Sequence, residues 1–127
     1  MISRIWHGWT KRKDADTYEG MLRADVLPGI HRVSGYQGAY LLRRDDGDEV
    51  EFVTITLFDD MEAVRRFAGV DYTKAVIHEP ARRLLTHFEE RSAHYETILT
   101  PEEIRALAGA VRSESSTRHS ESNRPSA

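Results

Sequence analysis

The sequence predicts an α+β fold, with an antiparallel four-stranded sheet that carries its helices on one face. Two runs with strand character, residues 36–44 and 50–58, are separated by an acidic turn that contains glycine, which is typical of a β-hairpin. A strand-like start precedes this hairpin, and helical periodicity flanks it on both sides. In chain order the expected elements are β-α-β-β-α-β and one further helix. This order is the ferredoxin-like arrangement.

The first strand is expected over residues 2–9, which are rich in β-branched and aromatic side chains. Side chains of a strand alternate between its two faces. One face therefore carries Ile5, His7 and Trp9, and the other face carries Arg4, Trp6 and Gly8. A histidine between apolar neighbours is either a core residue whose hydrogen bonds are made within the protein or part of a functional site. The sequence leaves both alternatives open for His7.

The first helix is expected to begin at Asp14, because Tyr18, Leu22 and Val26 recur at helical spacing and form one apolar face. Pro28–Gly29 bends or ends this helix, since proline has no N–H to donate into it. The hairpin of the second and third strands follows.

The second half of the chain predicts a helix, an irregular region and a last strand. Residues 59–62 have the spacing of a capping box that begins with Asp, and the helix that follows is expected to end at Gly69. Residues 71–87 predict a turn and then a short helix from Pro80. Residues 89–99 are expected to form the last strand.

A C-terminal helix is indicated by Thr100, Pro101 and Glu103, which supply an N-cap, a proline in the first turn and a capping glutamate. Its apolar stripe consists of Ile104, Leu107, Ala108 and Val111. We therefore expect a ferredoxin-like domain over residues 1–99, a helix over residues 100–112 and a disordered, serine-rich tail over residues 113–127.

The composition argues against several classes of function. Lys and Arg number 18 against 21 Asp and Glu, so 18 − 21 gives a net charge of −3 and no basic footprint for nucleic acid or for an anionic membrane. The absence of cysteine excludes disulfides, thiolate catalysis and cysteine-bound metal. No apolar run reaches membrane-spanning length, and the strand pattern begins at once, so we expect no leader peptide and a cytoplasmic location.

The third strand predicts a homodimer. Val53, Ile55 and Leu57 alternate with Phe52, Thr54, Thr56 and Phe58, so neither face of this strand is convincingly polar. Helices cover one face of the sheet, and the other needs a partner. A second copy of the chain satisfies this need most simply. We expect two sheets that face each other around a barrel-like interior.

The chain resembles a known family in a series of segments: RIWHGW, VLPGI, GYQGAYLLRR, GDEVEFVTITLFDDMEAVRRFAG, DYTKAV and ERSAHYE. Over residues 1–98 it is similar to the antibiotic biosynthesis monooxygenase (ABM) domain of the dimeric α+β barrel superfamily. The resemblance implies a ferredoxin-like protomer, a dimer and a cavity between sheet and helices. It further implies oxidation of anthrone-like polyketides or quinols by molecular oxygen, without a metal or an organic cofactor.

One branch of this family degrades heme and uses an asparagine, a tryptophan and a histidine. Aligned by eye, these fall at His7, Phe67 and Ile77, with His78 one place away. None of the three residues is kept, so heme degradation is not expected. The tryptophan, tyrosine and arginine of the polyketide oxygenases have no clean counterparts either.

The first and last strands are neighbours in a ferredoxin-like sheet, so we expect His7 and His94 to lie close together. Oxygenation without a cofactor needs a base, and histidine is the natural base near neutral pH. An apolar pocket would hold a flat aromatic substrate. The predicted site comprises His7 and His94 as catalytic residues, and Trp9, Thr54, Phe67, Tyr72 and Glu96 as substrate-binding residues, with Glu96 or Thr54 orienting the base.

Two classes of function remain open: a cofactor-independent monooxygenase for a small aromatic, polyketide or quinol-like molecule, and a non-catalytic dimeric module that binds a small ligand or a pathway partner. Convergence of His7 and His94 on a closed pocket would favour the enzyme. Strand histidines are also often structural hydrogen-bonded pairs. A site of two histidines and Glu96 for iron is conceivable, but no metal-binding spacing supports it, and we expect no metal.

Overall fold

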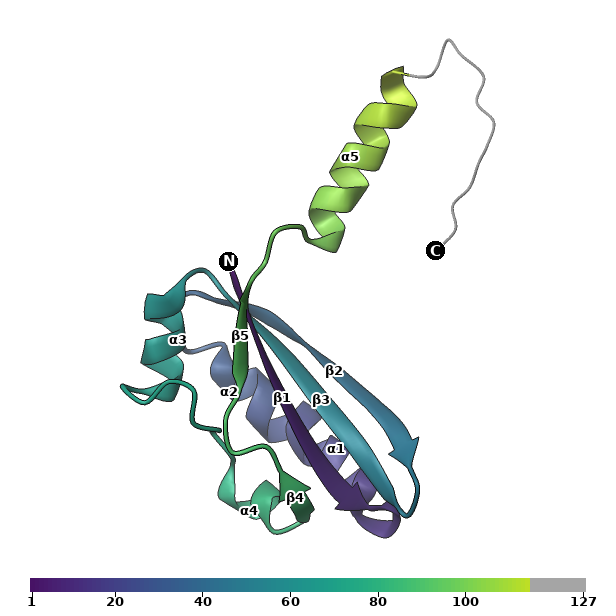
Figure 1. Cartoon of the computed structure of the whole chain (residues 1–127), viewed down its shortest axis with the longest axis vertical. Coiled ribbons are helices and arrows are strands. Elements are labelled where there is room, and N and C mark those ends of the chain that lie inside the picture. The colour runs from purple at the N-terminus through teal and green to yellow at the C-terminus, as the bar shows by residue number, and fades with distance from the viewer. Residues whose placement is uncertain (115–127) are drawn as a thin grey trace. The chain divides into compact units, whose positions relative to one another are not determined.

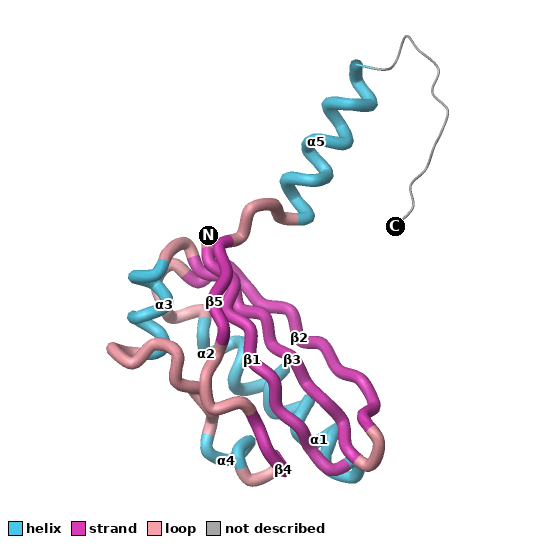
Figure 2. Tube along the Cα trace, in the orientation of Figure 1, coloured by secondary structure: helices cyan, strands magenta, loops and turns pink. Residues whose placement is uncertain are grey.

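The structure is a computed structural model and describes residues 1–114 (Figures 1 and 2). These residues divide into two units, residues 1–96 and residues 97–114. The elements of the first unit are β1 (Ile2–Lys11), the 3-10 turn η1 (Arg12–Asp14), α1 (Ala15–Met21), the π-helical η2 (Leu22–Val26), α2 (Leu27–Ile30), β2 (Tyr36–Asp46), β3 (Glu49–Phe58), α3 (Met61–Ala68), α4 (Glu79–Arg82), β4 (Leu85–Phe88) and β5 (Ala93–Glu96). The second unit contains α5 (Pro101–Glu114).

The sheet has the predicted ferredoxin-like order. β2 pairs with β3, β3 pairs with β1, and both β4 and β5 pair with the free edge of β1, all antiparallel. β2 and β3 form the predicted hairpin, which turns at Gly47, where φ is +63°. In the register, His7 lies opposite Val53, and Arg4 lies between Thr56 on β3 and His94 on β5. The α+β prediction is confirmed.

The last strand differs from its prediction, because residues 85–88 and 93–96 form two short strands and the sheet has five strands instead of four. Of the residues between them, Glu89 still donates to the carbonyl of His7 in β1 at 3.0 Å, and residues 90–92 pair with the preceding loop. The N–H of Ala75 donates to the carbonyl of Glu90 at 2.9 Å, and the N–H of Ser92 donates to the carbonyl of Thr73 at 2.6 Å. The indole of Trp6 also donates to the carbonyl of Glu89 at 2.7 Å. These bonds draw the edge strand out of the ladder.

The helices of the first unit cover one face of its sheet (Figure 1). The predicted face of the first helix is confirmed, since Tyr18 and Leu22 are buried against Val50 and Phe52 of β3. A π-helical turn precedes Pro28, which cannot donate to the preceding turn, and the helix ends at Ile30. A second cluster packs Ala63 and Val64 of α3 against Phe58. Asp60 caps α3 by accepting from the N–H of Ala63 at 2.9 Å, and α3 ends at Gly69.

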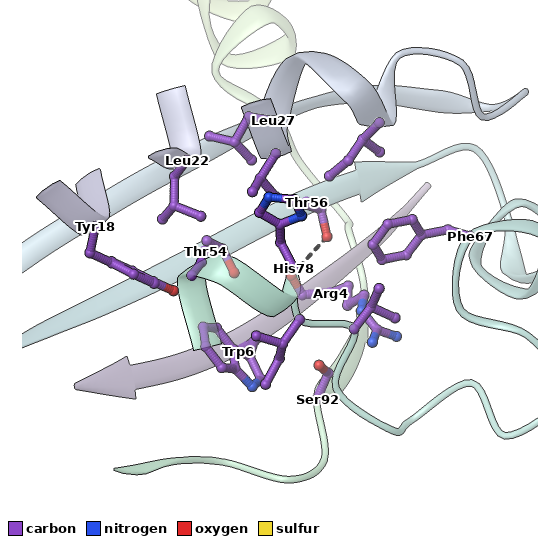
Figure 3. A pocket seen from close by; sticks show the side chains of 15 residues that line it. Arg4, Trp6, Tyr18, Leu22, Leu27, Thr54, Thr56, Phe67, His78 and Ser92 are labelled. Atoms are coloured by element: carbon purple, nitrogen blue, oxygen red, sulfur yellow. Dashed lines mark hydrogen bonds between the residues drawn. The ribbon is translucent and has the colours of Figure 1, made fainter. Parts of the chain in front are cut away.

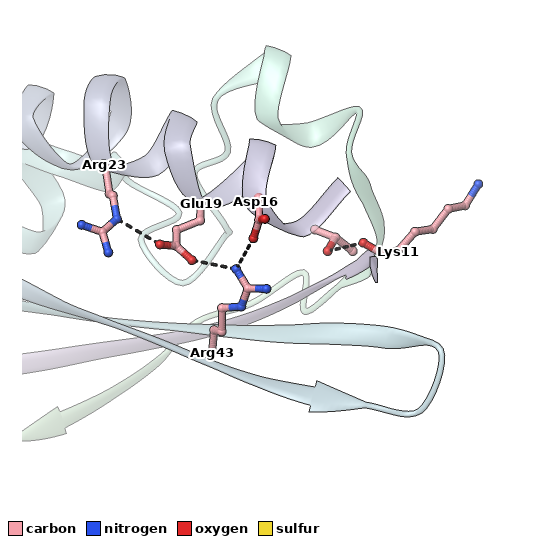
Figure 4. Close-up of polar contacts among 6 residues, drawn as sticks. Lys11, Asp16, Glu19, Arg23 and Arg43 are labelled. Atoms are coloured by element: carbon pink, nitrogen blue, oxygen red, sulfur yellow. Dashed lines mark hydrogen bonds and ion pairs between the residues drawn. The ribbon is translucent and has the colours of Figure 1, made fainter. Parts of the chain in front are cut away.

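Ion pairs fasten α1 to the edge strand β2 (Figure 4). Arg43 of β2 donates to Asp16 at 3.0 Å and to Glu19 at 2.7 Å, and Arg23 donates to Glu19 at 3.0 Å. The hydrogen bonds from Arg43 and Arg23 lower the pKa of Glu19. This network fixes the helix that forms one wall of the cavity described below.

The C-terminal helix begins with the predicted capping box. The N–H of Glu103 donates to the Thr100 hydroxyl at 3.1 Å, and the N–H of Thr100 donates to the Glu103 carboxylate at 2.8 Å. The helix continues to Glu114, two residues beyond its predicted end. The rest of the predicted tail, residues 115–127, lies outside the described residues. Within residues 1–114, no helix has the length and apolar character that crossing a membrane requires.

Gly35, between α2 and β2, provides a test of the packing of α3. Its φ is +92°, and an added Cβ would lie 2.6 Å from the Cβ of Ala63. Gly35→Ala is expected to lower the free energy of unfolding by about 2–4 kcal/mol, because backbone strain and overlap add. Urea unfolding measures it. The matched control is Gly20→Ala in α1, where no atom lies within 4 Å. This control is expected to gain about 0.5–1 kcal/mol, and a stable Gly35→Ala protein would contradict the described packing.

Candidate functional site

A cavity lies between the helix-facing side of the sheet and the helices that cover it (Figure 3). The strands contribute polar and aromatic groups, and the helices contribute mainly aliphatic side chains. It is lined by Arg4, Trp6, Tyr18, Leu22, Val26, Leu27, Ile30, Thr54, Thr56, Phe67, Val76, Ile77, His78, Ala81 and Ser92. The lining is largely apolar with a few convergent polar groups, which is typical of a small-molecule site.

Aromatic side chains from three elements form the walls of the cavity: Trp6 of β1, Tyr18 of α1 and Phe67 of α3. Trp6 is fixed by its hydrogen bond to the carbonyl of Glu89 and lies along the strand over Gly8. A Cβ at Gly8 would lie 2.5 Å from the Trp6 ring, so glycine is the residue that leaves room for it. Tyr18 packs edge-on against Phe52 with ring centroids 4.8 Å apart. Rigid walls of this kind suit a flat ring.

Arg4 brings a buried positive charge to the cavity, since only 4% of its surface is exposed. Its guanidinium donates to the carbonyl of Tyr72 and, at 2.9 Å, to the carbonyl of Lys74. It also lies over the ring of Phe67, 5.5 Å from the centroid. Burial lowers the pKa of Arg4 to about 10, so this side chain remains charged at neutral pH.

His94 lies beside Arg4 and is held in the neutral state. Its Nε2 is 3.0 Å from the guanidinium, and because arginine has only donors, Nε2 accepts this hydrogen bond. Burial and then the positive charge of Arg4 lower the pKa of His94 below its usual range. Its ring packs edge-on against Tyr72, with centroids 5.3 Å apart. The lone pair that a general base needs is therefore already engaged.

The other polar groups of the cavity differ in their partners among the residues that the structure describes. The Thr56 hydroxyl donates to the carbonyl of Arg4 at 3.4 Å. The hydroxyl of Ser92, a residue with 6% exposure, is buried without a hydrogen bond. Burial raises the pKa of Tyr18 and keeps its phenol protonated. His78 precedes α4, is exposed at the cavity, and extends toward Thr56 in Figure 3.

His7 lies on the opposite face of the sheet, so the predicted convergence of His7 and His94 is wrong. The cause is the alternation of β1, which sends Arg4 toward the helices and His7 away from them. His7 Nδ1 lies 2.7 Å from a carboxylate oxygen of Glu51, whose other oxygen accepts from Arg44 at 2.6 Å. These hydrogen bonds, from His7 first and Arg44 second, lower the pKa of Glu51. His7 is thus an oriented histidine on the open face.

The structure brings only part of the predicted substrate-binding set together. Thr54 and Phe67 line the cavity as expected. Tyr72 contributes its carbonyl to Arg4, and Glu96 is exposed at the end of β5. Trp9 lies on the open face, where it stacks on His87 at 4.3 Å and donates to Asp46 at 2.9 Å. In residues 1–114, no group of three histidine, aspartate or glutamate side chains is arranged to hold a metal ion.

Sequence reasoning missed four residues with roles in this geometry: Arg4, His78, Ser92 and Glu51. The alternation of the first strand had already placed Arg4 on the face of Trp6, and that signal could have identified it. Glu51 follows from pairing the first strand with the third in the correct register. No pattern in the sequence marks Ser92, whose burial depends on the loop it pairs with.

The fold is that of antibiotic biosynthesis monooxygenases of known structure. A mutant of SnoaB, a cofactor-independent oxygenase from Streptomyces nogalater, is 21% identical with a TM-score of 0.55, over 80% of this chain and 98% of that one. The monooxygenase ActVA-Orf6 from Streptomyces coelicolor, in complex with nanaomycin D, is 15% identical with a TM-score of 0.55, over 79% and 91%.

The same fold also occurs with a different chemistry. The heme degrader MhuD from Mycobacterium tuberculosis, with two hemes bound in its active site, is 18% identical with a TM-score of 0.51, over 79% of this chain and 98% of that one. By sequence, no family model and no curated protein matches the chain. These likenesses define the fold, and function depends on the residues of the cavity.

The contact between His94 and Arg4 predicts a pH dependence of stability. Because the pKa of His94 is lowered in the folded state, the unfolded chain binds more protons between that pKa and the ordinary value of 6.5. Stability contributed by neutral His94 is therefore lost as the pH falls through this window. His94→Gln is expected to show a shallower loss than wild type in urea unfolding at a series of pH values. An imidazole that titrates at or above 6.5 by NMR would contradict the assignment.

Proposed function

We propose that this protein is a cofactor-independent monooxygenase of the ABM type that acts on a small aromatic, polyketide or quinol-like molecule with molecular oxygen. The observation that carries the proposal is the cavity of about 60 Å³, whose aromatic walls lie beside the charge of Arg4. The likeness in fold to a cofactor-independent oxygenase and to a monooxygenase holding nanaomycin D supports it.

The reaction that suits this cavity begins with removal of a proton from the substrate. An electron-rich anion then reduces oxygen directly and forms a hydroperoxide, from which one oxygen atom remains as a carbonyl and the other leaves as water. In this way the methylene of an anthrone and one molecule of oxygen give a quinone carbonyl and one molecule of water. Of the groups lining the cavity, His78 is the one suited to take the proton near neutral pH.

One observation favours the second class of function, a non-catalytic module that binds a small ligand. His7 and His94 do not meet, and each is engaged in a hydrogen bond with a charged neighbour. Among the described residues that line the cavity, His78 is then the one histidine, and it lies at the exposed side. A ligand-binding module needs only the aromatic walls and the charge of Arg4, and turnover separates the two classes.

We also infer a homodimer formed through the open face of the sheet. The register places Ile5, Val53, Ile55 and Leu57 together there, flanked by Tyr40, Leu42 and Tyr95. The last three side chains are 46%, 47% and 56% exposed. An apolar face of this extent is unusual on a monomer, and the same face on a second copy covers it symmetrically.

Oxygen uptake by metal-stripped protein with a panel of anthrones and hydroquinones tests the enzyme. We expect turnover that survives chelation and falls at least about a hundredfold in His78→Ala, because the variant lacks the base. His31→Ala, which removes an exposed histidine outside this cavity, is the control and is expected to keep the wild-type rate.

Each other outcome of the uptake experiment has a definite meaning. Equal rates in wild type and His78→Ala would remove His78 as the base. Collapse in His7→Ala instead would place the chemistry on the open face, where Glu51 orients that histidine. No uptake with any compound of the panel would favour the binding module.

Sedimentation velocity tests the dimer. Leu42→Glu is expected to convert a dimer into monomers, because it places two carboxylates in an apolar interface. Val70→Glu, at a loop position with 96% exposure, is the matched control and is expected to leave the dimer intact. A wild-type chain that sediments as a monomer at all concentrations would contradict the inference.

A further inference from the structure

Arg4 is a buried cation that the fold leaves without a counter-ion. It forms no ion pair within the described part of the chain, and none of the residues lining the cavity is an aspartate or a glutamate. His94, its nearest titratable contact, is a neutral acceptor. A buried charge without an opposite charge is costly, so a protein that retains one commonly uses it to bind a ligand.

We infer that Arg4 and Ser92 form an anion subsite, and that the cavity selects aromatic ligands carrying an anionic oxygen, either a carboxylate or an ionised phenol. The inference deepens the proposed function, since it concerns the substrate class of the same cavity. The oxygen binds at Arg4 and Ser92, and the ring lies against Trp6 and Phe67.

The hydrogen bonds of Arg4 leave donors available for such a ligand. A guanidinium has five N–H groups. Three contacts engage it: the carbonyls of Tyr72 and Lys74, and Nε2 of His94. Two N–H groups therefore remain without a partner among residues 1–114. The three bonds that exist hold the guanidinium in place, so that a ligand meets a donor that is already oriented.

Ser92 supplies a second donor on the same face of the sheet. Because His94 lies opposite Arg4 and Ala93 lies opposite Ile5, Ser92 follows on the side of Arg4 and Trp6. Both residues also bind the same loop, Ser92 through the carbonyl of Thr73 and Arg4 through those of Tyr72 and Lys74. Figure 3 shows the Ser92 hydroxyl and the Arg4 guanidinium among the side chains that line the cavity. A buried hydroxyl without a partner is unfavourable, and a bound anion would satisfy it.

The pairing also predicts that a neutral ligand binds less tightly than an anionic one. A neutral amide of the same shape would leave the charge of Arg4 uncompensated, and it would place an NH2 group where a carboxylate has its second acceptor oxygen. An anionic oxygen accepts from both residues at once. An ionised phenol bound in this position stays ionised because it lies beside the positive charge of Arg4. The ionised phenol is the form that reacts with oxygen in the proposed chemistry.

Benzoate and benzamide, which have the same shape and differ in charge, are the probes. Titrations are followed by NMR of the Trp6 indole and the Ser92 amide. We expect wild type to bind benzoate at least about tenfold more tightly than benzamide, because only benzoate neutralises the buried charge of Arg4 and offers a charged acceptor to its N–H groups. Ser92→Ala is expected to lose several-fold of this preference and Arg4→Met all of it, while the control Arg83→Gln, at an exposed position of α4's end, keeps it.

Ser92→Ala keeps the test decisive even if Arg4→Met does not fold. The Ser92 hydroxyl has no partner within residues 1–114, so its removal is expected to leave stability unchanged or raised. Weaker benzoate binding in a stable variant is then an effect on the ligand alone. Equal binding of the two probes, no binding of benzoate, or an unchanged preference in Ser92→Ala would each overturn the subsite. Benzoate is not oxidised, so its binding does not depend on turnover. The oxygen-uptake experiment therefore tests the proposed function separately from the anion subsite.

Discussion

The hydrogen bonds from Arg4 to the carbonyls of Tyr72 and Lys74 are the interaction on which the cavity depends. The loop that follows α3 has no ladder of its own with the central strands, and these bonds tie it to β1. The same loop supplies Val76, Ile77 and His78 to the cavity and leads into α4. One strand residue therefore positions a wall that lies about 70 positions away in sequence.

The two-residue period of β1 divides the polar chemistry of the protein between two separate environments. Arg4 faces the cavity with a neutral histidine beside it, and His7 faces the open side with the carboxylate of Glu51. The sheet separates the two sets, so neither histidine can serve the other's site. Contact with a second copy of the chain would bury the His7 and Glu51 pair without bringing it nearer to the cavity.

Much of the fold could be predicted from the sequence, because local signals carry it: the alternation of the hairpin, the helical spacing of Tyr18 and Leu22, and the capping box at Thr100. The split of the last strand could not, since it depends on pairing between residues 73–75 and 90–92 and on the indole of Trp6. The site was predicted only in part. Thr54 and Phe67 follow from face and spacing, whereas an arginine in a strand is ordinarily expected at the surface, and only tertiary packing buries Arg4.

The break at residues 89–92 makes the two edges of the sheet unequal. Unpaired N–H and C=O groups on a sheet edge form a template to which another chain can add a strand. Short edge strands present few of these groups. β4 and β5 have four residues each, whereas β2, at the other edge, runs unbroken over 11. Aggregation of partly unfolded chains by strand addition is therefore directed to β2, where the charged end of that strand, Arg43 to Asp46, is the main safeguard against it.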